Sequence, residues 1–284
     1  MTDKLFLKEG NFYITNVCNL TCERCITYNN FKFTGHYKWD EYKEMFEEWS
    51  RRIDIGMIGL IGGEPFANPD VMQWSLGLKS LWPKTKDFSI STNGTFIKHK
   101  ISEIRELIKH GIWIDACVHD PAHYKEVEDA LNEAVSIFPN ITIQPGSDVI
   151  LDYYSGPTHI ARLYTTYVFA KNSIKDIKNR LIYMHNSDPV KAHGRCGLCH
   201  YFVKGHLFKC YLTSIGQELI EQLPVEESAR DLLTSYRSCS PYDDDQFLHQ
   251  FLDTIEMPIS QCSLCPETPS MKPIWPLLKK KTTI

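Results

Sequence analysis

Short apolar runs alternate with amphipathic stretches along the first half of the chain. Consecutive apolar residues between turn-forming residues are typical of buried strands, and apolar residues three or four positions apart are typical of helices. The predicted strands cover Asn11–Val17, Met57–Ile61, Asp87–Ser91, Ile112–Val118 and Ile141–Gln144. The predicted helices cover Trp39–Ile53, Asp70–Leu81, Ser102–Lys109 and His123–Ile137. This alternation predicts an α/β fold with a parallel sheet and right-handed crossovers, closed or partly closed into a barrel.

The pattern becomes weaker after about residue 153. We expect Ala161–Phe169 to form the last strand of the barrel and Ser173–Tyr183 to form a helix. Past Asn186 the chain is rich in cysteine, glycine and turns, which is typical of a small domain organised by metal. The sequence therefore predicts two parts, residues 1–185 and residues 186–284.

Charge and hydropathy narrow the classes of function. The 31 basic and 35 acidic side chains give a formal net charge of −4, so the chain lacks the broad cationic field that nucleic-acid binding usually needs. The first residues lack the apolar segment of a signal peptide, and no run of about 18 apolar residues occurs. We therefore expect a soluble, cytoplasmic protein with no membrane partner, and nucleic acid is disfavoured as a partner. The terminal Lys279-Lys280-Lys281 is predicted to be a solvated tail.

The ten cysteines gather in two groups, one near the start and one in the last third. A chain without an export signal is expected in a reducing compartment, where closely spaced cysteines more often hold metal than form disulfides. Cys117 lies in an apolar run and is predicted to be a small buried core residue. Cys239 lies in a polar segment and is predicted to be a bystander.

Three cysteines follow the first predicted strand with the spacing Cys18-x3-Cys22-x2-Cys25. Three thiolates on one tight loop can converge on a single iron–sulfur cube. Because a cube has four irons to ligate, three protein ligands leave one iron open to a substrate or cofactor. A zinc site is the alternative interpretation of the same spacing.

Two motifs follow the next predicted strands. Gly62-Gly63-Glu64-Pro65 comes directly after Met57–Ile61, and Ser91-Thr92-Asn93-Gly94 ends the following strand. Together with the three-cysteine spacing, these motifs resemble the signature of the radical S-adenosylmethionine (radical SAM) superfamily. The resemblance implies an α/β fold that is a partial (β/α)6 barrel of the TIM type, with its site at the C-terminal ends of the parallel strands.

The resemblance also implies roles for these residues. The three cysteines would be the catalytic metal ligands, holding the 4Fe–4S cluster to which S-adenosylmethionine (SAM) binds. The Gly-Gly-Glu-Pro motif would contact the methionine amino group of SAM through backbone atoms, where a glycine leaves room for the ligand. The segment Ser91-Thr92-Asn93 would contact the ribose and carboxylate of SAM.

One position departs from the family pattern. The residue before the third cysteine is often aromatic in the family and packs near adenine, whereas here it is Arg24. The adenine contact is therefore unassigned, with Ile26 and Tyr28 as candidates.

The family chemistry begins at the open iron, which the amino and carboxylate groups of SAM chelate. An electron from the reduced cluster breaks a carbon–sulfur bond, and the resulting 5′-deoxyadenosyl radical abstracts hydrogen from a substrate in the barrel mouth. A donor such as flavodoxin or ferredoxin would supply the electron. His119 and Asp120 follow a strand that ends at this mouth, and they are candidate substrate contacts.

The second group of cysteines contains Cys196-x2-Cys199, Gly205-x4-Cys210 and Cys262-x2-Cys265. This pattern resembles the auxiliary-cluster extensions of the superfamily called SPASM and, in the shorter form with a single cluster, twitch. The resemblance implies a small, Cys-rich C-terminal domain with one auxiliary 4Fe–4S cluster. Cys210, Cys262 and Cys265 would be ligands, and either Cys196 or Cys199 would be the fourth, with a slight preference for Cys199. A zinc ribbon is the structural alternative.

These observations predict an enzyme that abstracts hydrogen from a small-molecule substrate, such as a sugar or aminosugar, in a net oxidation. Twitch-bearing alcohol dehydrogenases of aminoglycoside assembly are the model for this reaction. A second enzymatic hypothesis is a maturase that modifies a ribosomally made peptide. The early start of the barrel is an argument against it, because we expect no space there for an N-terminal domain that binds a leader peptide. The hypothesis from another class is a non-catalytic zinc protein whose Cys-rich end is an interaction module.

Overall fold

One large sheet carries the predicted α/β pattern. The computed structural model describes residues 4–22, 25–119, 121–139, 141, 143–145, 161–165, 167–170, 174–194, 196, 199–267, 270–273 and 278–280. The strands of the large sheet are β1 (Leu5–Tyr13), β3 (Ile53–Ile61), β4 (Asp87–Thr92), β5 (Trp113–Val118), β6 (Ile143–Pro145), β7 (Ala161–Thr165), β11 (Tyr201–Val203) and β12 (His206–Phe208). Their order is β12-β11-β1-β3-β4-β5-β7-β6, and every neighbouring pair is parallel except β11 and β12.

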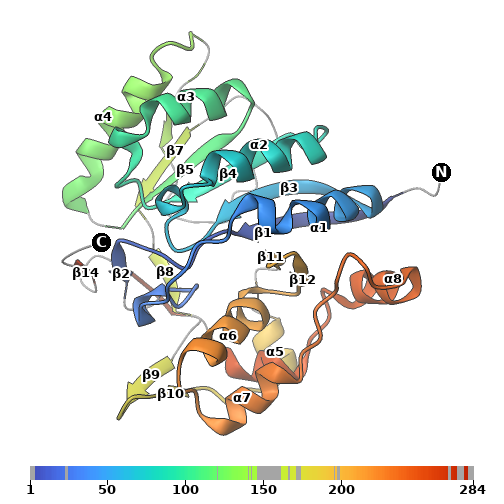
Figure 1. Ribbon diagram of the computed structural model, residues 1–284. Helices are drawn as coiled ribbons and strands as arrows, with labels where there is room; N and C mark the ends of the chain where they lie inside the picture. The colour runs from blue at the N-terminus through green and yellow to red at the C-terminus, as the bar shows by residue number, and fades with distance from the viewer. Residues whose placement is uncertain are drawn as a thin grey trace.

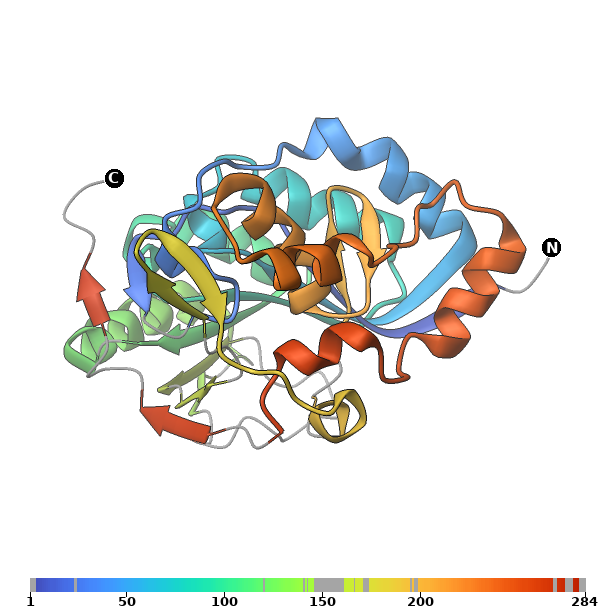
Figure 2. The same ribbon diagram turned by 90° about the horizontal axis from the view of Figure 1, so that it is seen from below.

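Helices cover both sides of this sheet. The first group is α1 (Trp39–Arg52), α2 (Val71–Leu81), α3 (Ile101–Lys109) and α4 (Tyr124–Val135). The second group is α5 (Pro189–His193), α6 (Tyr211–Gln222), α7 (Glu227–Thr234) and α8 (Asp245–Thr254). Figure 1 shows the first group above the sheet and the second below it, and in Figure 2 the second group lies in front. Short 3-10 turns are η1 (Asn29–Phe31), η2 (Pro65–Ala67), η3 (Ile97–His99), η4 (Pro121–His123) and η5 (Ser260–Leu264).

The alternation of strands and helices up to residue 135 is confirmed, and with it the partial barrel. Each predicted element has a counterpart that overlaps it, although β1 begins at Leu5, earlier than predicted. Helix α1 forms because its aromatic residues recur at helical spacing, so that Phe46 and Trp49 are both buried against the sheet. The C-terminal ends of β1, β3, β4 and β5 meet at one edge of the sheet, where the sequence places its motifs.

The far end of the sheet differs from a simple barrel order. Strand β7 lies between β5 and β6, so that Ala161 pairs with Ile114 on one side and with Ile143 on the other. The predicted last strand, Ala161–Phe169, is therefore two strands. The chain leaves the large sheet after Thr165, and β8 (Tyr167–Ala170) pairs antiparallel with β13 (Ser270–Pro273).

The helix predicted over Ser173–Tyr183 is wrong. The structure has an antiparallel hairpin of β9 (Ile174–Ile177) and β10 (Arg180–Tyr183). Its two turn residues, Lys178 and Asn179, have φ angles of 54° and 64°. Two consecutive residues with positive φ form a turn whose twist matches that of the two flanking strands. This turn favours a hairpin, although the apolar residues have helical spacing.

The β11–β12 hairpin joins the Cys-rich part of the chain to the barrel. Strand β11 pairs parallel with β1, and the turn residues Lys204 and Gly205 both have positive φ. The buried apolar residues of α6 and α7 belong to the same core cluster as those of the barrel. Residues 201–255 therefore share the core of the barrel, and the division at residue 185 stays a prediction.

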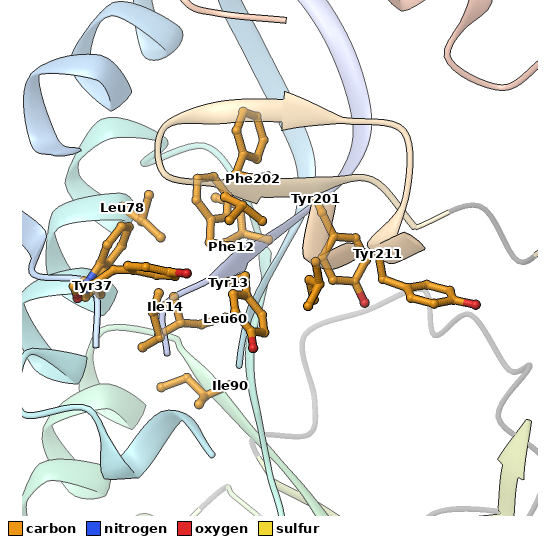
Figure 3. Close-up of a cluster of buried hydrophobic side chains, with 14 of the residues drawn as sticks. Phe12, Tyr13, Ile14, Tyr37, Leu60, Leu78, Ile90, Tyr201, Phe202 and Tyr211 are labelled. Carbon is orange, nitrogen blue, oxygen red and sulfur yellow. Dashed lines mark hydrogen bonds between the residues drawn. The ribbon is translucent and has the colours of Figure 1, made fainter. Parts of the chain in front are cut away.

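Stacked aromatic rings fix the hairpin on β1. Phe202 of β11 stacks on Phe12 of β1 with ring centroids 4.6 Å apart, and Phe46 and Trp49 of α1 contact the same ring. Figure 3 shows Phe12 and Phe202 facing each other inside this cluster. The indole nitrogen of Trp49 donates a hydrogen bond of 2.8 Å to the carbonyl of Gly205 in the hairpin turn. The sheet, the first helix and the hairpin are thus one packed unit.

The C-terminal lysines are not a free tail where the structure describes them. Strand β14 (Leu278–Lys280) pairs antiparallel with β2 (Leu20–Cys22), so its backbone runs beside the first group of cysteines. Lys281 lies outside the described residues. Within the described part of the chain, no helix is long and apolar enough to span a membrane.

We expect Phe202→Ala to lower the free energy of unfolding by about 3–5 kcal/mol, because it leaves a cavity between β1, α1 and β11. Denaturant unfolding measures the change. Phe6→Ala is the matched control, since this side chain is 66% exposed and its loss is expected to change stability by less than about 0.5 kcal/mol. Equal effects of the two substitutions would contradict the role of Phe202.

Candidate active site

The first three cysteines lie on the loop between β1 and η1, at the C-terminal edge of the sheet. Cys18 is buried, whereas Cys22, at the end of β2, and Cys25 are partly buried. Burial raises the pKa of the Cys22 thiol above its ordinary value, and the neighbouring Cys25 and Cys18 raise it further. The structure therefore brings the three predicted ligands within electrostatic range of one another.

The donor set fits an iron–sulfur cube. Among the described residues, no three Cys, His, Asp or Glu side chains come close enough together to hold a single metal ion. In a cube each thiolate binds a different iron, so the sulfurs lie further apart than the ligands of one ion. Three sulfurs on one loop suit such a cluster. Because the pKa of Cys22 is raised, binding of a metal there must release its proton.

The two glycines after β3 are needed by the cysteine loop itself. A Cβ on Gly63 would lie 2.3 Å from the carbonyl oxygen of Val17, and one on Gly62 would lie 2.7 Å from Thr15 Cγ2. The backbone nitrogen of Gly63 donates to the carbonyl of Thr15 at 2.7 Å. From the sequence, we attributed the need for glycine at these positions to the space that a bound cofactor requires. The structure adds a second cause, because the chain's own backbone approaches too closely for a side chain.

Glu64 joins the two predicted SAM-binding motifs. Its carboxylate accepts hydrogen bonds from the Thr92 hydroxyl at 2.6 Å, the Asn93 backbone nitrogen at 2.7 Å and the Phe66 backbone nitrogen at 3.1 Å. The side chain is fully buried, and burial raises its pKa to about 7. Glu64 therefore positions the end of β4 against the end of β3, and its side-chain oxygens have these internal partners.

Asn93 extends this link to the cysteine loop. Its side-chain nitrogen lies 3.8 Å from Cys18 Sγ and donates to Asn19 Oδ1 at 2.8 Å. Cys25 is held in a similar way, with Thr27 Oγ1 3.2 Å from its sulfur. Hydrogen-bonding groups around a ligand sulfur orient it and tune the metal it binds. Polar contacts thus reach the first and third cysteines from different parts of the site.

The remaining predicted residues of the two motifs lie at the same edge. Pro65 is buried and begins η2, and Ser91 is partly buried near the end of β4. Gly94 has a φ of +83°, and a Cβ there would lie 2.8 Å from Val127 Cγ1. The Asn-Gly pair is therefore required by the turn as well as by packing against α4.

The structure separates the two candidates for the adenine contact. Tyr28 is buried, and its ring lies 6.3 Å from that of Tyr211, the residue after Cys210. Ile26 is 39% exposed beside the cysteine loop. Ile26 is therefore the better placed of the two, and Arg24 lies outside the described residues.

Four cysteines of the second group line one pocket. Cys196, Cys210, Cys262 and Cys265 share it with His193, Lys209 and Tyr211. Cys199 is not part of this lining, and its thiol instead makes a hydrogen bond with Glu9 on β1. The geometry thus favours Cys196 as the fourth ligand, against the slight preference that the spacing gave to Cys199. Cys239 is buried beside β12, where its backbone pairs with Leu207 away from the pocket.

Helix α6 begins at this pocket. Cys210 is its N-cap residue, and the backbone nitrogen of Cys210 donates to Thr213 Oγ1 at 3.3 Å. Burial raises the pKa of the Cys210 thiol to about 11, and Cys196 and Cys262 are among the neighbours that contribute. Burial also lowers the pKa of Lys209, an effect that the neighbouring thiols oppose. Four thiols is the number of ligands that a closed 4Fe–4S cluster needs.

Comparison with known proteins decides the family. A family model described as the radical SAM superfamily matches residues 12–189, which include the end of β1, the cysteine loop and both motifs. The chain belongs to the radical SAM superfamily. Members use a 4Fe–4S cluster and SAM, and they act on a substrate with the help of a reductant.

Individual relatives match over part of their length. The chain is 29% identical over 126 residues to a GTP 3′,8-cyclase of Campylobacter fetus subsp. fetus, covering 43% of this chain and 39% of the relative. It is 27% identical over 158 residues to a GTP 3′,8-cyclase of Listeria monocytogenes serovar 1/2a, covering 49% of this chain and 47% of the relative. The matches span less than half the length of each cyclase.

Among solved structures, BtrN in complex with AdoMet and 2-DOIA is 18% identical to this chain. That comparison covers 93% of this chain and 94% of BtrN, with a TM-score of 0.49.

Sequence reasoning missed one residue at the mouth of the radical SAM barrel. Cys117 was predicted to be a core residue, but it is only partly buried near the end of β5 and lies within electrostatic range of Cys22. Its sulfur lies 3.9 Å from Nδ1 of His119, whose pKa burial lowers to about 4. The position of Cys117 at the C-terminal end of a barrel strand was the available signal. Asp120 lies outside the described residues.

Glu64 gives this radical SAM protein a pH-dependent stability. The unfolded chain ionises this carboxyl near its ordinary pKa of 4.5, whereas the folded protein keeps the proton until about pH 7. The unfolded state thus binds fewer protons between these values, and stability falls as pH rises through the window. At about 1.4 kcal/mol per pKa unit, the loss amounts to about 3 kcal/mol.

We expect Glu64→Gln to remove this part of the pH dependence. The measurement is the free energy of unfolding of both cluster-loaded proteins at pH 5.5 and 7.5, so that effects of acid on the clusters cancel in the comparison. Equal pH slopes for the two proteins would show that the carboxyl titrates normally.

Proposed function

We propose that this radical SAM enzyme abstracts a hydrogen atom from a small-molecule substrate and that the net reaction is a two-electron oxidation. The observation that carries the proposal is the convergence of Cys196, Cys210, Cys262 and Cys265 in one pocket. A cluster with four protein ligands has no open iron for a substrate, so electron transfer is the chemistry left to it. Sugar or aminosugar alcohols are the first substrates to test.

Two cysteine sets would hold the cofactors. Cys18, Cys22 and Cys25 would hold the cluster that binds SAM, and the four pocket cysteines would hold the auxiliary cluster. When bound, the first cluster with SAM supplies a 5′-deoxyadenosyl radical that takes a hydrogen atom, and the second supplies a one-electron acceptor. A donor such as flavodoxin or ferredoxin would reduce the protein.

The chain's own residues would position SAM, orient the cysteine ligands and hydrogen-bond the substrate. The Glu64 network fixes the ends of β3 and β4, whose backbone would contact SAM. Asn93 and Thr27 orient Cys18 and Cys25. Because burial lowers the pKa of His119 to about 4, its imidazole is neutral at neutral pH and would hydrogen-bond an uncharged substrate group.

A redox-neutral cyclisation is the second candidate function. It is favoured by the name of the relatives, GTP 3′,8-cyclase, although the matches cover less than half of each relative. The substrate would then be GTP. A peptide maturase and a zinc interaction module have no corresponding observation, and family membership disfavours the zinc module.

The mass of the product separates the two reactions. Anaerobic incubation with SAM, a reductant and either a panel of aminosugars or GTP is followed by mass spectrometry. The proposal expects formation of 5′-deoxyadenosine together with a product lighter than its substrate by two hydrogens. A product from GTP with unchanged mass would instead establish cyclisation and overturn the proposed oxidation.

The auxiliary ligand set is tested by a matched pair of variants. We expect Cys196→Ala to lower the iron content from roughly eight to roughly four atoms per chain, because one cube is lost. Cys199→Ala should keep roughly eight, since this thiol lies outside the pocket. Iron and sulfide are counted after anaerobic reconstitution. Loss of iron in Cys199→Ala alone would move the fourth ligand to Cys199.

Cys22→Ala tests the first ligand set. We expect it to abolish reductive cleavage of SAM while the auxiliary cluster stays in place. The measurements are 5′-deoxyadenosine production and the iron content, with Cys117→Ala as a control for a nearby thiol outside the motif. SAM cleavage that persists in Cys22→Ala would refute this assignment.

A further inference from the structure

A buried lysine lines the auxiliary pocket directly before one of its cysteines. Lys209 lies between β12 and Cys210, and it is 2% exposed. Its ammonium donates a hydrogen bond to the carbonyl of Ile255. A buried charge is costly unless an opposite charge lies near it. The described ion pairs give Lys209 no carboxylate partner.

The opposite charge is available in the pocket itself. The groups that act electrostatically on the Lys209 ammonium include Cys210, Cys262 and Cys196, followed by the exposed Glu256. A 4Fe–4S cube with four thiolates is negatively charged in either oxidation state, and more so when reduced. The ammonium therefore suits a pocket that holds a cube, and its attraction is stronger for the reduced form.

A tyrosine on the other side of Cys210 adds a hydrogen-bonding group. The Tyr211 hydroxyl lies 3.9 Å from the sulfur of Cys265. The ring is buried, with centroids 6.3 Å from Tyr28 and 6.4 Å from Tyr201, so its direction is fixed by packing. Hydrogen bonds to ligand sulfurs and nearby charge are two of the means by which a protein sets a cluster's potential.

We infer that Lys209 and Tyr211 raise the reduction potential of the cluster in the four-cysteine pocket, so that it accepts an electron more readily. Lys209 acts through its positive charge and Tyr211 through its hydrogen bond to Cys265. Both are positioning residues that act on the ligand set and not on the substrate: Tyr211 contacts Cys265, and Lys209 lines the same pocket. The inference rests on the proposed auxiliary cluster, and it concerns the reversible addition of one electron to that cluster.

Potentiometric titration followed by electron paramagnetic resonance tests the inference on the full chain with both clusters loaded. Lys209→Gln keeps a donor for the Ile255 carbonyl but removes the charge, and Tyr211→Phe removes only the hydroxyl. For Lys209→Gln we expect at least a tenfold shift of the redox equilibrium toward the oxidised cluster, which is 59 mV for one electron. For Tyr211→Phe we expect a smaller shift in the same direction.

Lys79→Gln is the matched control. Lys79 also donates to a carbonyl, that of Thr85 at 2.8 Å, but it lies on α2 outside the pocket. We expect it to move neither potential. The potential of the SAM-binding cluster should stay unchanged in all three variants, so a general loosening of the fold would be recognised by a shift of both clusters.

Unchanged auxiliary potentials in both variants, with iron content intact, would overturn the inference. Loss of the cluster from Lys209→Gln would assign Lys209 to assembly and overturn its redox role, leaving Tyr211→Phe to decide the hydrogen bond. A wild-type protein that holds only one cube would instead refute the proposed auxiliary cluster. The two failures are therefore distinguishable by iron count.

Discussion

The close backbone contact between the ends of β1 and β3 is the constraint on which the site depends. Beyond the last residues of these strands, the ladder continues through hydrogen bonds from Gly63 to Thr15 and from Glu64 to Val17. The approach is so close that a Cβ on Gly63 would overlap the Val17 carbonyl. Because Cys18 comes directly after Val17, this contact fixes where the cysteine loop leaves the sheet. The glycines therefore act on the predicted metal ligands through the backbone.

A buried carboxyl extends the same constraint to the third strand. Glu64 accepts hydrogen bonds from Thr92 and Asn93, and Asn93 in turn lies against Cys18. Burying a carboxyl is costly, and only a complete set of hydrogen-bonding partners makes it acceptable. The raised pKa of Glu64 reflects the part of this cost that its partners do not offset. Through these protein contacts, three strand ends are held in one arrangement.

The sequence predicts the barrel well because its signals are local. The alternation of apolar runs and helical spacing determines the elements up to residue 135, and the Cys18-x3-Cys22-x2-Cys25 spacing locates the loop. The failures concern turns and partners distant in the chain. Two residues with positive φ, Lys178 and Asn179, turn a predicted helix into a hairpin. The spacing also cannot show whether Cys196 or Cys199 is the fourth ligand, because this depends on which of the two thiols lies in the same pocket as Cys262 in the folded chain.

Aromatic packing fixes the position of one cysteine set relative to the other. Tyr28 follows the loop of Cys25, Tyr211 follows Cys210, and their rings lie against each other in the interior. The β11–β12 hairpin is held on β1 by Phe202 and Phe12, so the start of α6 is fixed relative to the barrel. Cores packed to this extent do not deform continuously. The separation of the two proposed clusters is therefore a property of the folded chain.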